Sequence, residues 1–70
     1  MMTLAQGTIN KRYQIKDVNS DDSIKDFLLT LGCFAGEDVT IITKLSSNLI
    51  INVKDAKYSI DENLAKTIII

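Results

Sequence analysis

A helical pattern stops abruptly within residues 27–42, which read FLLTLGCFAGEDVTII, and an alternating strand pattern follows a few residues later. The apolar positions around the helical part recur at i, i+3, i+4 and i+7: Ile24, Phe27, Leu28 and Leu31. This spacing predicts one apolar stripe on a helix about two turns long. Gly32 ends the helix, because glycine adopts a left-handed conformation without steric penalty. So short a helix does not persist alone in water, and its stripe has to pack against the rest of the chain.

Short strands account for most of the remaining sequence. After a turn at Gly36, alternation predicts strands at 39–44, 49–53, 58–60 and 67–70, hairpin loops at 45–48 and 54–57, and an earlier strand from residue 13 that bends near Asp17. Helical turns are expected at 4–6 and 61–66, and the helix N-cap between Ser20 and Asp22. In the last strand, Ile68 and Ile70 are expected to face inward and Ile69 outward. The chain is thus mostly β, with about five strands, and a small, partly closed barrel removes the edges that so short a sheet would expose.

Residue counts limit the chemistry. Residues 1–70 are expected to form a single domain with a small core, because so short a chain buries only about 60% of its unfolded surface. The chain has no His and one Cys, which cannot form an internal disulfide and fits a reducing compartment. Without His it lacks the usual general base near neutral pH and the commonest zinc ligand. No nucleophile–base pair is visible either, so we expect neither an enzyme nor a cofactor.

The charge balance argues against nucleic acid and membrane insertion. Eight basic and nine acidic residues give a net charge of −1, whereas nucleic-acid binders rely on an excess of basic groups. Lys11, Arg12 and Lys16 flank Tyr13, but this short basic cluster is better explained as a solvated strand edge. No apolar run approaches the roughly 18–20 residues of a membrane helix, and no secretory signal is visible. A cytoplasmic location is expected.

The order and spacing of these features resemble the family of ferrous iron transport protein A, FeoA, whose members are small SH3-like barrels. The resemblance is carried by Leu28, Leu31, Gly32, Phe34, Gly36 and Val39, by TLA near the N-terminus, and by YSI followed by Ala65 and Ile68. Ala35 stands where the family usually has Pro, and Asn10 where it usually has Gly. Asn is the next best residue for left-handed geometry, so neither departure threatens the fold.

The resemblance implies a function as well as a fold. It implies a cytoplasmic, non-enzymatic accessory that binds and modulates a membrane ferrous-iron permease carrying a G-protein domain. The same barrel also resembles the C-terminal domain of iron-dependent repressors, and the alternative is therefore a metal-responsive regulatory domain. Fold alone does not choose between them.

Candidate partner-binding residues follow from the periodicity, because the family supplies no agreed ligand set. Leu29 lies off the apolar stripe of the helix, and with Cys33 and Phe34 it is expected to form an exposed apolar patch. A buried, inert thiol is the better interpretation of Cys33 considered alone. Ile69 is the fourth candidate, because the uncharged end of the chain could add as a strand to another chain.

Two further kinds of site are not expected. Acidic residues lie around the start of the helix and after Gly36: Asp21, Asp22, Asp26, Glu37 and Asp38. Their position favours helix capping and dipole compensation over a cation site, which leaves room only for weak divalent metal binding. Recognition of proline-rich peptides needs an aromatic-lined groove, and Phe27 is expected to be used in the core.

Overall fold

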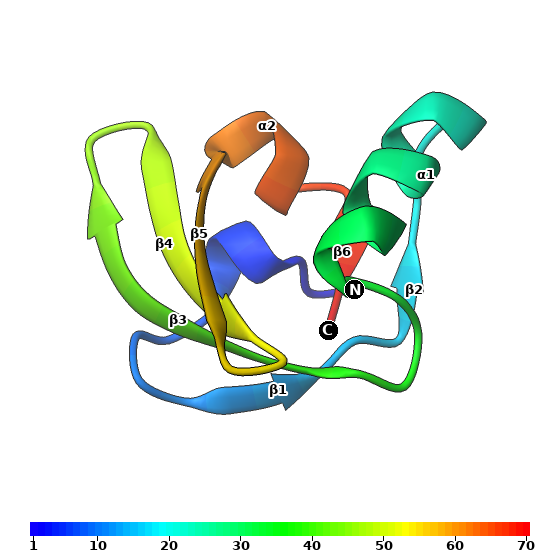
Figure 1. Cartoon of the computed structure of the whole chain (residues 1–70). Helices are drawn as coiled ribbons and strands as arrows, with labels where there is room; N and C mark the ends of the chain where they lie inside the picture. The colour runs from blue at the N-terminus through cyan, green and yellow to red at the C-terminus, as the bar shows by residue number, and fades with distance from the viewer.

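The computed structural model describes residues 1–70 and contains six strands in two sheets, two α-helices and one 3-10 turn (Figure 1). In chain order these are η1 (Leu4–Gln6), β1 (Arg12–Gln14), β2 (Asp17–Val18), α1 (Asp22–Leu31), β3 (Asp38–Leu45), β4 (Asn48–Val53), β5 (Ala56–Asp61), α2 (Glu62–Ala65) and β6 (Ile68–Ile69). The mostly β class, the helix and the helical turns agree with the sequence prediction. The strand expected from residue 13 is split into β1 and β2.

The strands form two antiparallel sheets that close around one core. The larger sheet has the order β1-β3-β4-β5, and the smaller one pairs β2 with β6. A register shift between Ile41 and Thr43 marks a bulge in β3, which lets the long central strand bend. An isolated bridge between Thr3 and Ile69 ties the N-terminal segment to β6. Figure 1 shows the result, in which the larger sheet curls around η1 while β6 and β2 lie on the other side.

Alternate residues of the strands fill the interior. In β4, Leu49, Ile51 and Val53 are buried, as their spacing predicts. Leu4 of η1 and Ala65 of α2 have no exposed surface, so both helical turns cover the ends of the core. The connected core comprises Leu4, Ile15, Val18, Leu28, Cys33, Val39, Ile41, Leu49, Ile51, Val53, Ile60, Ala65, Ile68 and Ile70.

Two expectations about burial are wrong. Ile69 was predicted to face outward, but it is buried, because β6 lies between β2 and the N-terminal segment and has no free edge. Phe27 was predicted to belong to the core, but 48% of its surface is exposed. The face of α1 that packs on the core is narrow. Leu28 lies at its centre and is fully buried, while Ile24 and Leu31 pack beside it and are half-buried.

The junction between α1 and β3, residues 32–37, folds as its glycines predict. Asp21 caps the helix by accepting a hydrogen bond from Ile24 N–H at 2.9 Å. Gly32 has φ 95°, and Cys33 N–H donates to the Leu28 carbonyl at 2.9 Å, which closes the last turn. Gly36 also has φ 95°, and its N–H donates to the Ile15 carbonyl at 2.8 Å. The junction is therefore anchored to the segment between β1 and β2.

Candidate functional site: a groove between the first helix and strand β2

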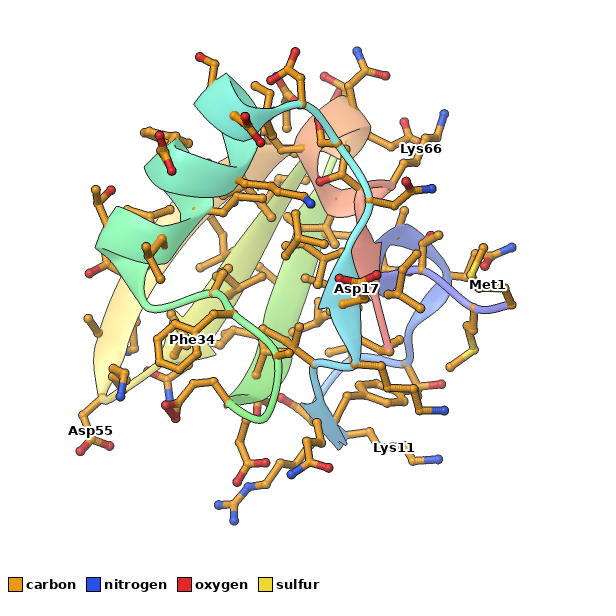
Figure 2. All side chains as sticks on the ribbon, turned by 90° about the vertical axis from the view of Figure 1, so that its right-hand side faces the viewer. Met1, Lys11, Asp17, Phe34, Asp55 and Lys66 are labelled. Atoms are coloured by element: carbon orange, nitrogen blue, oxygen red, sulfur yellow. The ribbon has the colours of Figure 1, made fainter.

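A shallow groove of about 210 Å³ lies between α1, β2 and the junction. Its lining consists of Asp17 and Val18 of β2, Lys25, Asp26 and Leu29 of α1, and Cys33, Phe34 and Ala35 of the junction. The floor is apolar and the charged side chains stand around it. Figure 2 shows the molecule from the side that presents Asp17 and Phe34 to the viewer.

Three of the four predicted partner-binding residues meet in this groove. Leu29 is 56% exposed, as the phase of the helix predicts, and Phe34 is half-buried. Cys33 lines the floor with 1% exposure. Ile69 does not line the groove. The structure thus brings Leu29, Cys33 and Phe34 together, and their role in binding stays a prediction.

Lys54 holds the junction from the opposite hairpin. Its Nζ lies 2.7 Å from Glu37 Oε1 and 5.2 Å from the centroid of the Phe34 ring, within the range of a cation–π contact. A Cβ on Gly32 would lie 3.0 Å from Lys54 Cδ, so the Lys54 side chain passes directly over the helix end. The hairpin between β4 and β5 therefore steadies one wall of the groove.

Sequence reasoning missed Lys54, because its partners are brought near only by the folding of the barrel. Lys54 and Asp55 form the two-residue turn between β4 and β5, and both have positive φ, 49° and 62°. This geometry is typical of a type I′ turn, which favours Asn or Gly at both positions. The sequence does predict a hairpin loop at 54–57, but no local signal in it indicates that Lys54 contacts Glu37 and Phe34.

The electrostatics of the groove follow from Asp17, Asp26 and Lys25, whose formal charges sum to −1. Asp17 Oδ1 accepts a hydrogen bond from Val18 N–H at 2.8 Å, so this carboxylate lies against its own strand. Burial raises the pKa of the Cys33 thiol from 9.0 to about 11. A protonated thiol is a poor nucleophile and a poor metal ligand, so Cys33 contributes apolar floor rather than reactivity.

The acidic residues near the junction do not gather into a metal site. The structure has no group of three or more His, Cys, Asp or Glu side chains that could hold a metal ion. Asp21, one of the N-cap candidates between Ser20 and Asp22, caps α1, and Asp61 caps α2 by accepting from Leu64 N–H at 2.8 Å. Glu37 is paired with Lys54. Capping or ion pairing therefore accounts for Asp21, Asp61 and Glu37.

In the basic cluster around Tyr13, Lys11 makes a local contact. Thr8 N–H donates to the Tyr13 hydroxyl oxygen at 2.8 Å, and Lys11 Nζ lies 5.3 Å from the centroid of the Tyr13 ring. Hydrogen bonding from Thr8 lowers the pKa of Tyr13. These contacts order the turn before β1.

None of the helices has the length and apolarity to cross a membrane.

A family model for the FeoA domain matches residues 2–70, which include every element of the barrel and the whole groove. The chain belongs to the FeoA domain family. Solved structures of other FeoA proteins are described in terms of ferrous iron transport. The sequence resemblance and the SH3-like fold are thereby confirmed. No curated protein matches the chain.

Solved structures show the same fold at low sequence identity. The zinc-complexed FeoA of Stenotrophomonas maltophilia, described as a prokaryotic SH3-domain protein, is 23% identical with a TM-score of 0.87, over 99% of this chain and 88% of that chain. An iron uptake regulatory protein (FeoA) is 15% identical with a TM-score of 0.89, over 96% of this chain and 91% of that chain. A manganese-dependent transcriptional repressor is 8% identical with a TM-score of 0.86, and the match covers 96% of this FeoA domain but 39% of the repressor.

Proposed function

We propose that this FeoA domain is a cytoplasmic, non-enzymatic accessory of ferrous iron uptake that binds the membrane ferrous-iron permease and modulates it. The G-protein region of the permease is the first candidate for the contact. The observation that carries the proposal is the groove, where Leu29 and Phe34 leave apolar surface in water beside a rigid β-barrel. No pair of catalytic groups lines this groove, which suits a binding module.

A direct binding measurement tests the proposal. The purified chain is titrated with the cytoplasmic G-protein domain of the permease, with GDP and with a GTP analogue, beside Leu29→Asp and Phe34→Asp variants. A buried unpaired carboxylate is costly, so we expect each substitution to weaken binding by at least about tenfold. Because both side chains are partly exposed, the variants should keep the circular dichroism spectrum of the wild-type chain.

The chain offers a matched control. Leu45, at the end of β3, is 57% exposed and does not line the groove, whereas Leu29 is 56% exposed. Leu45→Asp adds the same charge at the same exposure and should bind like the wild type. Equal losses in Leu29→Asp and Leu45→Asp would show that net charge, not the groove, controls binding. Absence of binding in every nucleotide state would overturn docking on the G-protein region.

The second candidate is a metal-responsive regulatory domain. It is favoured by the likeness to the manganese-dependent repressor and by the zinc complex of the Stenotrophomonas FeoA. The absence of a cluster of metal-ligating side chains speaks against it. Tight, saturable metal binding by the purified chain would favour this candidate over the accessory role.

A further inference from the structure

Strand β2 has a strand neighbour on one edge only. It pairs with β6 through Asp17 opposite Ile69 and Val18 opposite Ile68, and no strand lies on its other side. Both residues of β2 line the groove, while no residue of β6 does, so the unpaired edge borders the groove. In Figure 2, β2 lies with α1 and the Phe34 loop on one side and the N-terminal segment on the other. An unpaired edge of this kind can accept an added strand.

The edge is protected by a local contact. The carboxylate of Asp17 occupies the hydrogen-bonding position of Val18 N–H. A side chain that accepts a hydrogen bond from the backbone N–H of its neighbour occupies the donor that an added strand would use. It therefore protects a free strand edge from unspecific pairing with other chains. An incoming strand has to compete with this contact, and a basic side chain that draws the Asp17 carboxylate away would aid the exchange.

The size of the groove limits what it can hold. Its volume of about 210 Å³ is below the roughly 300–1,000 Å³ typical of small-molecule pockets. One or two apolar side chains between Leu29 and Phe34 are the better fit. Asp17 and Asp26 outnumber Lys25 on its sides, so a complementary segment carries a basic residue next to its apolar anchor.

We propose that the groove takes an extended segment of the partner, which adds alongside β2, places one apolar side chain between Leu29 and Phe34, and sets a Lys or Arg beside Asp17 and Asp26. This inference rests on the proposed function, because it names the kind of permease segment that docks. It adds backbone hydrogen bonds between β2 and the partner segment, which burial of Leu29 and Phe34 alone does not require.

Other occupants suit the site less well. A second copy of this chain pairing through β2 would bring two Asp17 side chains close together, and like charges facing each other in a strand pair are destabilising. A helix satisfies its own backbone and would leave the edge of β2 unused. It would also present several anchors at i, i+3 and i+4 to a groove that accommodates one or two.

The test uses the full chain labelled with nitrogen-15 and two sets of decapeptides. One set tiles the cytoplasmic segments of the permease, and the other is a library with a fixed central Leu. Selected peptides should carry Lys or Arg near the anchor, shift the amide signals of residues 17–18 and 29–35, and slow hydrogen exchange in β2. Asp17→Asn keeps an oxygen that can accept from Val18 N–H, so it removes the charge alone.

Charge-removing substitutions test whether Asp17 and Asp26 recognise a basic residue of the peptide. Asp17→Asn combined with Asp26→Asn should weaken a Lys-containing peptide about twofold to fivefold, as expected for exposed ion pairs. The same double variant should leave the Lys→Gln version of that peptide unchanged. Equal losses for both peptides would overturn the charge part of the proposal.

The outcomes separate the two proposals. If the G-protein domain binds but every bound peptide is helical or shifts signals away from β2, the accessory function stands and strand addition fails. If the library selects basic, extended peptides at β2 but no permease segment binds, strand addition stands and the permease assignment fails. Concentration-dependent shifts at β2 without peptide would identify a second copy as the occupant and overturn the inference, and failure of both sets to bind would also overturn it.

Discussion

Single residues take their chemistry from burial and hydrogen bonding. Cys33 is 1% exposed, and desolvation alone raises the pKa of its thiol. The Cys33 thiol is therefore protonated and unreactive near neutral pH, although it lines an exposed groove. Tyr13 shows the opposite direction, because hydrogen bonding from Thr8 lowers its pKa. The candidate site thus combines an exposed rim with an inert floor.

The Cys33 thiol predicts a loss of stability at high pH. In the unfolded chain the thiol ionises near 9.0, whereas in the folded chain it stays protonated up to about pH 11. Between these values the unfolded state binds fewer protons, so the free energy of unfolding falls by roughly 1.4 kcal/mol per pH unit. Urea unfolding of the wild type and of Cys33→Ala from pH 8 to 11 measures this. The wild type should lose stability relative to the variant, and parallel pH curves would contradict the prediction.

Among the elements, the junction between α1 and β3 depends on two glycines in the same backbone conformation but different surroundings. Both have φ 95°. A Cβ on Gly36 would meet nothing within 4 Å, whereas a Cβ on Gly32 would press on the Lys54 side chain, which also contacts Glu37 and Phe34. A substitution at Gly36 therefore tests the cost of backbone strain alone, whereas the same substitution at Gly32 also displaces Lys54.

Alanine substitution at these positions should have graded effects. Gly36→Ala should lower the free energy of unfolding by about 1–2 kcal/mol, the cost of a left-handed L-residue. Gly32→Ala should lower it further, because Lys54 has to move, and should also weaken binding at the groove through the Phe34 loop. Urea unfolding and the permease titration measure both effects. A larger loss of stability in Gly36→Ala would refute the assigned role of Lys54.

At the scale of the whole molecule, the barrel is closed by contacts between distant parts of the chain. The two sheets share one core, and the Thr3–Ile69 bridge joins the first and last segments of the chain. No cluster of metal-ligating side chains contributes to this closure. The folded state should therefore have no metal requirement.

EDTA should leave the midpoint of thermal unfolding unchanged. A metal present at ten times its Kd would stabilise the chain by about 1.4 kcal/mol, or roughly 6–11 °C in Tm for a domain of this size. Thermal unfolding is followed by circular dichroism with EDTA and with 0.1 mM Zn²⁺ or Fe²⁺. A rise of about 6 °C or more in added metal would indicate a Kd near 10 µM or tighter and would favour the metal-responsive role.

Local chemistry in the sequence was enough to predict the helix, an N-cap between Ser20 and Asp22, the helix end at Gly32 and the two hairpins. Each of these depends on neighbours within a few residues, where steric and hydrogen-bonding preferences act directly. Exposure of Leu29 also followed from helical phase.

Long-range contacts account for what sequence reasoning missed. Ile69 is buried because the N-terminal segment covers its strand. Phe27 is exposed because the face of α1 that packs on the core carries Ile24, Leu28 and Leu31 but not Phe27. Lys54 reaches Phe34 only because the β4–β5 hairpin folds back over the helix end. Strand alternation and helical phase give the direction of each side chain, but which faces are covered depends on how the barrel closes.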